Sequence, residues 1–126
     1  MVNIGMYFEI PVTDMQRAIA FYSAVFDIEF ECADIDGNEM ALFPLIDGAE
    51  GCSGALARGE GYVPSLDGTR IYLTVTDIEQ VMATALLAGA KTLYPITQVG
   101  EVFKVAEFQD PKGNRIAFLE RAFRSN

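Results

Sequence analysis

The sequence contains no histidine and no tryptophan, and only two of its 126 residues are cysteines. Without histidine, the chain lacks the commonest side-chain ligand for zinc, nickel and ferrous iron. Cys32 and Cys52 have no CxxC spacing, and two cysteines are too few for a disulfide framework. We predict that both are reduced and that Cys52 is a small buried hydrophobe.

Positive charge is also scarce, because 9 Lys and Arg residues face 18 Asp and Glu residues, giving a net charge of −9. Such a chain repels phosphate backbones and anionic lipid surfaces, so we predict no nucleic-acid partner and no membrane partner. The sequence has neither a basic leader followed by an apolar stretch nor an apolar run that could cross a bilayer. We therefore expect a cytoplasmic protein whose scattered acidic residues keep it soluble.

Apolar residues are abundant, at 51% of the chain, with 9 Phe and 5 Tyr. A chain of this length can bury a core without disulfides or a structural metal. We therefore expect a single compact domain.

The chain repeats itself at an offset of 63 residues, which aligns 12–16 (VTDMQ) with 75–79 (VTDIE). In each copy a Thr, Thr13 or Thr76, stands three residues before Gln or Glu, which predicts a capping box at a helix start. Apolar residues then recur at helical spacing. These residues are Met15, Ile19, Tyr22 and Phe26 in the first copy, and Ile78, Met82, Ala85 and Leu86 in the second.

Strand-like runs surround each predicted helix. They cover 7–12, 29–33, 39–44 and 52–57 in the first repeat, and 71–75, 92–96, 102–108 and 115–119 in the second. Asp36-Gly37 suits a hairpin turn with positive φ angles, Gly89 suits a helix end, and 110–113 (DPKG) suits a turn between strands. Both repeats therefore read βαβββ.

These elements predict an α+β fold with a first repeat at 1–57, a linker at 58–68, a second repeat at 69–120 and a tail at 121–126. Each helix covers one face of its sheet and leaves the other face bare. We predict that the two tandem βαβββ modules form a curved, mostly antiparallel eight-stranded sheet around a cavity, with the helices outside.

Two motifs carry a family resemblance: 10–14 (IPVTD) followed by 18–22 (AIAFY), and 110–115 (DPKGNR). The chain resembles the vicinal oxygen chelate superfamily, which includes glyoxalase I, the bleomycin-resistance proteins and the extradiol dioxygenases, from Tyr7 to Glu120. The segments 54–56 (GAL) and 59–65 (GEGYVPS) are similar to a bacterial lactoylglutathione-lyase-like subgroup.

The resemblance implies a cavity in which enzymatic members hold a divalent metal with His, Glu or Gln. The corresponding positions here are Tyr7, Arg70, Ala117 and the strand through Gly54 to Leu56. None of them is a usual ligand, and a permanent positive charge at Arg70 repels a divalent cation. We therefore expect no metal and no other cofactor.

Side chains alternate along a strand, so Glu9 shares the cavity-facing side with Tyr7, and Arg70 shares it with Tyr72 and Thr74. Glu9 is either a general base or an acceptor for a ligand donor, or else it pairs with a cation or lies at a wet rim. Arg70 either binds a ligand carboxylate through its planar fork, pairs with Glu9, or lies at the solvated start of its strand.

The hydroxyls of Tyr7 and Tyr72 either donate to a carbonyl or oxyanion, or belong to packed rings and contact only solvent. Glu107 is a carboxylate among Val, Ala and Phe, and the sequence leaves open which face of the sheet it lies on, because a shift of one residue along the strand exchanges the two faces. Leu56 and Ala117 complete the predicted ligand-binding set. A linker segment that includes Gly59, Gly61 and Tyr62 either forms a flexible flap over the cavity or simply turns the chain.

Three functions remain open from the sequence. The first is a metal-independent protein that binds a small, partly apolar molecule, to sequester it as bleomycin-resistance proteins do or to sense it. The second is a glyoxalase-like lyase or isomerase in which Glu9 is the general base and Arg70 or a tyrosine stabilises an oxyanion. The third is a dimer partner whose cavity is packed shut. The resemblance also implies a homodimer.

Overall fold

The computed structural model describes residues 3–121. The chain divides into two compact units, residues 1–64 and 65–126, which we call module one and module two and describe separately. The division falls within the linker predicted at 58–68. Of the tail predicted at 121–126, only Arg121 belongs to the described residues.

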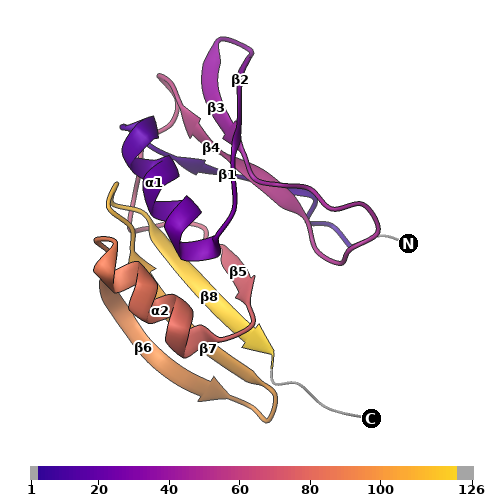
Figure 1. Cartoon of the computed structure of the whole chain (residues 1–126), viewed down its shortest axis with the longest axis vertical. Coiled ribbons are helices and arrows are strands. Elements are labelled where there is room, and N and C mark those ends of the chain that lie inside the picture. Colours follow the sequence, from indigo (N-terminus) through magenta and orange to yellow (C-terminus); the bar gives the residue numbers. More distant parts are fainter. Residues whose placement is uncertain (1–2, 122–126) are drawn as a thin grey trace. The chain divides into compact units, whose positions relative to one another are not determined.

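Module one has the order strand, helix and three strands (Figure 1). Its elements are β1 (Tyr7–Pro11), α1 (Met15–Phe26), β2 (Glu31–Ile35), β3 (Asn38–Leu42) and β4 (Ser53–Arg58). The sheet order is β1-β4-β3-β2. The β2/β3 and β3/β4 pairs are antiparallel, whereas β1 runs parallel to β4.

Module two repeats this arrangement. Its elements are β5 (Tyr72–Val75), α2 (Ile78–Leu87), β6 (Lys91–Val99), β7 (Phe103–Gln109) and β8 (Arg115–Arg121). The sheet order is β5-β8-β7-β6, with β5 parallel to β8 and the other pairs antiparallel. The predicted α+β fold of two βαβββ modules is confirmed. The strand predicted at 92–96 is longer, because β6 continues past two register shifts.

The cap of each helix lies one residue after the predicted threonine. The N-cap of α1 is Asp14, whose carboxylate accepts a hydrogen bond from the Arg17 amide at 3.1 Å. The N-cap of α2 is Asp77, which accepts from the Gln80 amide at 3.2 Å. The prediction of Thr13 and Thr76 as caps was wrong, because a carboxylate one position further on reaches the third helical amide.

The predicted turns are confirmed. Gly89 follows α2 with a φ of 111°, its amide donates to the Leu86 carbonyl at 3.2 Å, and the next amide donates to the Ala85 carbonyl at 2.9 Å. This pair of bonds is a Schellman motif. Asp36 and Gly37 have φ angles of 54° and 80°, as a two-residue hairpin between β2 and β3 requires.

The motif at 110–115, which contributes to the family resemblance, has a structural role in joining β7 to β8. The Asp110 side chain is only 1% exposed. It accepts hydrogen bonds from the Lys112 amide at 2.9 Å, the Asn114 amide at 2.9 Å and the Asn114 side chain at 3.1 Å. Buried polar groups must be satisfied in this way, so the motif fixes the turn.

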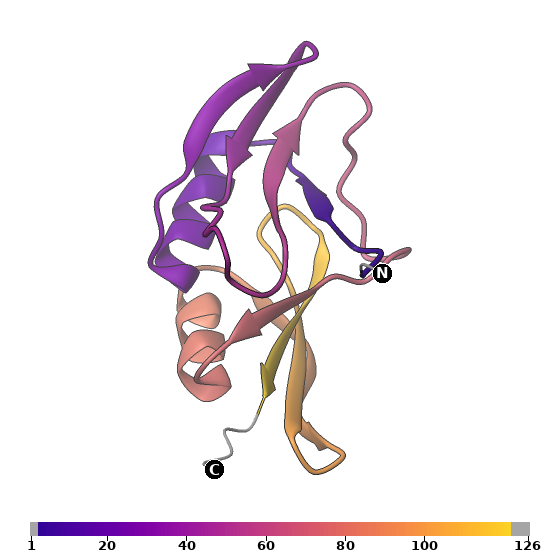
Figure 2. The same ribbon diagram turned by 90° about the vertical axis from the view of Figure 1, so that its right-hand side faces the viewer.

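In each module the helix lies along one face of its own sheet (Figure 2). In module one, Tyr22 of α1 contacts the ring of Phe43, which in turn contacts Phe8 of β1. Because side chains alternate, Tyr7 and Glu9 point to the opposite side. We call this side, which the module's helix does not cover, the open face.

The open face of module two is defined in the same way. Phe108 and Phe118 are fully buried with their rings 4.6 Å apart, and Ile78 and Met82 of α2 are buried too. The alternate positions on β7 and β8, which include Glu107 and Ala117, therefore lie on the open face. Within the described part of the chain, neither helix is long and apolar enough to cross a membrane.

Candidate functional site

A carboxylate that accepts hydrogen bonds from two phenols lies on the open face of module one. The Tyr7 hydroxyl donates to Oε2 of Glu9 at 2.9 Å, and the Tyr62 hydroxyl donates to Oε1 at 2.6 Å. Tyr7 and Glu9 are two residues apart on β1, whereas Tyr62 comes from the segment after β4. We call these three residues the phenol–carboxylate cluster.

Tyr62 reaches Glu9 because the chain turns tightly after β4. A Cβ atom on Gly59 would overlap Oδ1 of Asn38, so the chain passes close against the β2–β3 hairpin. The Tyr62 amide then donates to the Gly59 carbonyl at 3.1 Å. The Tyr62 ring packs on an apolar floor formed by Met40, Leu42, Ala55 and Ala57.

The electrostatics of the cluster keep both phenols protonated. Partial burial of the Tyr7 ring, followed by the hydrogen bond to Glu9 and its charge, raises the pKa of Tyr7 to about 12. The pKa of Tyr62 is also raised, mainly by its hydrogen bond to Glu9 and then by burial. Both hydroxyls are therefore neutral donors at physiological pH.

A second carboxylate, Glu107, lies on the open face of module two between two arginines. Oε1 of Glu107 accepts from Nε of Arg115 at 2.6 Å, and Oε2 lies 3.4 Å from Nη1 of Arg70. Glu107 is 7% exposed and is the register partner of Ala117. The uncertainty about its facing is thus resolved, and Arg70 has a carboxylate partner within its own module.

The other predicted residues fall on both sides of their sheets. Tyr72 and Thr74 are exposed on the open face of module two, where Ala117 pairs in register with Tyr72. Leu56, by contrast, is fully buried on the side of β4 that faces α1, and Ala55 occupies the open face opposite Glu9. Cys52 is exposed, so its prediction as a buried hydrophobe was wrong.

Register identifies which residue of the strand through Gly54 to Leu56 corresponds to Ala117. Ala55 pairs with Glu9 as Ala117 pairs with Tyr72, so the four positions at which the resemblance implies metal ligands are Tyr7, Ala55, Arg70 and Ala117. Two methyl groups, a neutral phenol and a guanidinium do not form a ligand set for a divalent cation. These residues do not fit the metal of the enzymatic relatives.

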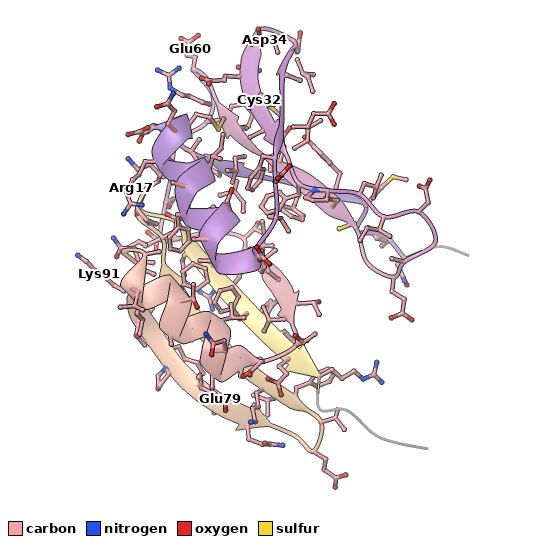
Figure 3. All side chains as sticks on the ribbon, in the orientation of Figure 1. Arg17, Cys32, Asp34, Glu60, Glu79 and Lys91 are labelled. Carbon is pink, nitrogen blue, oxygen red and sulfur yellow. The ribbon has the colours of Figure 1, made fainter. Side chains whose placement is uncertain are left out.

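The described residues also contain an acidic cluster at the start of α2, formed by Asp77, Glu79 and Glu120. Its carboxylates already have partners. Glu79 (Figure 3) pairs with Lys104 at 3.0 Å, and Glu120 accepts from the Ile78 amide at 2.7 Å. These contacts account for the cluster as helix capping and a surface ion pair.

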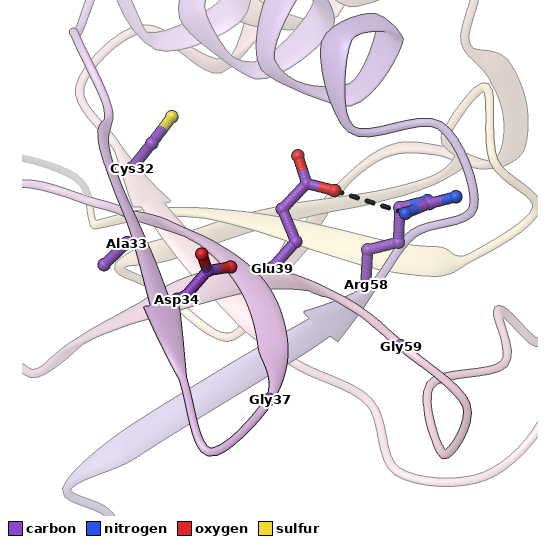
Figure 4. A pocket seen from close by; sticks show the side chains of 7 residues that line it. All are labelled: Cys32, Ala33, Asp34, Gly37, Glu39, Arg58 and Gly59. Carbon is purple, nitrogen blue, oxygen red and sulfur yellow. Dashed lines mark hydrogen bonds and ion pairs between the residues drawn. The ribbon is translucent and has the colours of Figure 1, made fainter.

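Module one contains a hollow of about 600 Å³ at the β2–β3 hairpin (Figure 4). It is lined by Cys32, Ala33, Asp34, Gly37, Glu39, Arg58 and Gly59. Arg58 and Glu39 neutralise each other at 3.3 Å, and both are about half exposed. A smaller hollow of about 380 Å³ adjoins the Tyr62 segment and includes Val12 and Thr13.

We place the candidate site at the phenol–carboxylate cluster because it combines a carboxylate, two donors and an apolar floor.

Comparison with known proteins gives a match that extends over both modules. A family model described as Glyoxalase/Bleomycin resistance protein/Dioxygenase superfamily matches residues 5–118. The chain belongs to this superfamily. The match confirms the resemblance that the two motifs predicted.

Individual members of the superfamily are distant from this chain. A glyoxylase-like domain-containing protein from Didymella fabae is 28% identical in an alignment of 122 positions, with 90% of each chain covered. A glyoxalase family protein from Bacillus cereus has a TM-score of 0.73 at 18% identity, with 98% and 97% of the two chains covered. The fosfomycin resistance protein FosX from Listeria monocytogenes has a TM-score of 0.66 at 12% identity, with 100% and 96% covered. The two structural likenesses show the fold alone.

Sequence reasoning did not assign Tyr62 or Arg115 to the site. Tyr62 lies outside any periodic element, so no alternation could place its ring over β4. Arg115 was noted only as part of the turn motif, although it has the same parity on β8 as Ala117 and therefore the same facing. That parity was the available signal.

Proposed function

We propose that this superfamily member binds a small, partly apolar organic molecule on an open face of its sheets without the metal of the enzymatic relatives. The observation that carries the proposal is the phenol–carboxylate cluster above an apolar floor in module one. Ligand sites commonly combine an apolar lining with a few convergent polar groups. Such a protein serves to sequester or to sense its ligand.

The cluster offers complementary hydrogen-bonding groups to a ligand. An ionised carboxylate has about four lone-pair sites, and the phenols of Tyr7 and Tyr62 use two of those on Glu9. Glu9 can therefore accept from a ligand N–H or O–H. The phenol hydroxyls can turn toward a ligand carbonyl if a ligand donor replaces them at Glu9.

Calorimetric titration with zinc, nickel and manganese tests the metal-free part of the proposal. We expect no stoichiometric tight binding to the purified protein. The E79Q variant is the control, because any weak uptake at the acidic cluster should disappear in it. Tight uptake that persists in E79Q and is lost on replacing open-face residues would overturn the proposal.

Native mass spectrometry of the purified protein, followed by a thermal-shift screen of small molecules, tests the binding part. Ligands that stabilise the wild type should bind more weakly to E9Q and to Y62F, which keeps the ring but removes its hydroxyl. E39Q is the matched control, because Glu39 lies in the same module on the opposite face. Equal affinity for all four proteins would place binding elsewhere and refute this site.

A second candidate function is a lyase or isomerase that uses Glu9 as general base. It is favoured by the 2.6 Å contact between Glu9 and Tyr62, since a neutral phenol beside a carboxylate can donate to a developing oxyanion while the carboxylate takes a proton. For any substrate found by screening, E9Q should abolish turnover and leave folding intact. Unchanged turnover in E9Q would remove this function.

We further propose that the protein is a cytoplasmic homodimer. The support for both statements is superfamily membership together with the charge pattern of the sequence. Light scattering coupled to size-exclusion chromatography tests the dimer, and a monomeric mass over the accessible concentration range would refute it.

A further inference from the structure

Two guanidinium groups share one buried carboxylate on the open face of module two. Arg70 and Arg115 both contact Glu107, one at each carboxylate oxygen. A buried carboxylate between two cations is locally overcompensated and leaves one net positive charge. This charge lies on a protein whose total is −9, so it is a local exception to the acidic surface.

The donors of the two arginines are only partly used. Each guanidinium has five N–H donors in a planar fork, and among the described residues of module two Glu107 is the acceptor for one from each. The side chains of Arg70 and Arg115 are 39% and 29% exposed, whereas that of Glu107 is 9% exposed. The carboxylate is thus covered while the forks remain accessible.

Register places hydroxyl groups on the sheet face that carries the two forks. Glu107 is paired across the sheet with Ala117, and Ala117 is paired with Tyr72. The Tyr72 and Thr74 hydroxyls lie on the same face of β5, where they add uncharged donors.

We infer that Arg70 and Arg115 bind an oxyanion group, a carboxylate or a phosphate, of a small-molecule ligand on the open face of module two, with Glu107 as the positioning residue that holds both forks. Planar guanidinium groups bind such oxyanions through paired, charge-assisted hydrogen bonds. The inference rests on the proposed function, because it names the charged group of that ligand.

Arginine Nε–H signals in the NMR spectrum of the full chain test the inference directly. Acetate and inorganic phosphate are titrated separately, and acetamide serves as the neutral analogue of acetate. We expect the Arg70 and Arg115 signals to move along one saturable curve with acetate, phosphate or both, and to stay in place with acetamide. The anion that gives the tighter curve identifies the ligand's group.

Three substitutions assign the binding. R70K keeps the charge but removes the fork, and should weaken anion binding about tenfold. R17K makes the same change at an exposed position on α1 and should leave it unchanged. In E107Q the exchange of the Arg115 Nε–H with water should accelerate, because its 2.6 Å acceptor is neutralised.

Absence of a saturable response to both anions, an equal response to acetamide, or equal affinities in R70K and R17K would each overturn the inference. These outcomes are distinguishable from failure of the proposed function. The proposed function fails if calorimetry shows tight metal uptake at the open faces or if E9Q binds screened ligands as tightly as the wild type, and neither measurement uses the arginine signals of module two.

Discussion

Replacing Glu9 by glutamine removes the negative charge that two phenol hydroxyls face in module one. In the wild type, partial burial and Glu9 together raise the pKa of Tyr7 to about 12, and Glu9 is the main cause of the raised pKa of Tyr62. E9Q should therefore lower the pKa of Tyr62 toward its usual value. The pKa of Tyr7 should fall only in part, because burial of its ring remains.

The magnitude follows from the Tyr7 value. A rise in pKa from about 10 to about 12 favours the protonated phenol by about 2.7 kcal/mol in a fully shielded site. Tyr7 is 53% exposed, and solvent screening reduces the effect on the free energy of unfolding to about 1 kcal/mol. The folded pKa lies above the unfolded one, so this contribution is complete below about pH 10 and is lost as the pH rises toward 12.

Tyrosinate absorbance measured as a function of pH gives the assay, and ring-carbon NMR shifts assign each transition. E9Q should show both cluster tyrosines ionising at lower pH than in the wild type. E39Q is the control, because it removes a carboxylate of module one that contacts Arg58 rather than a phenol. Identical tyrosine titrations in E9Q and wild type would refute the assignment of Glu9 as the shared acceptor.

Three further predictions concern stability, each measured as the free energy of unfolding in urea. G54A should cost about 3 kcal/mol or more, because the new Cβ would overlap the Phe8 carbonyl oxygen. The control G61A, where the space is open, should cost less than about 1 kcal/mol. Similar losses in the two variants would contradict the close approach of β1 and β4. D110A should cost about 2 to 4 kcal/mol by leaving three donors without their acceptor, and an unchanged midpoint would show that the turn holds without it. D77A should cost about 1 kcal/mol by removing the α2 cap. A larger loss of stability in T76A than in D77A would instead identify Thr76 as the cap.

Local chemistry made most of the fold predictable. The order of elements within each module, the Asp36-Gly37 hairpin and the Gly89 helix end each depend on residues close in sequence, and each is confirmed. The helix caps were displaced by one residue because Thr and Asp are both favoured N-cap residues and stand next to each other in both repeats. The parallel pairing of β1 with β4 is a long-range contact, which the alternation of side chains within a strand does not specify.

The candidate site was predictable only where alternation along a strand determined it. Tyr7 and Glu9 share a face, as predicted from their spacing. Leu56 was misassigned to that face because the predicted strand was not placed in register, and a shift of one residue exchanges it for Ala55. Tyr62 comes from an irregular segment 53 residues from Glu9, so only the folded chain brings the two together.

Segments that join tandem modules are usually tolerant of added or deleted residues. Here the joining segment carries Tyr62, held at a fixed distance from the end of β4 by the turn at Gly59 and by its bond to Glu9. Changes in the length of this segment should therefore be tolerated only after Tyr62. Residues inserted between Arg58 and Tyr62 would move the Tyr62 ring off its apolar floor. Residues inserted after Tyr62 would leave the ring in place.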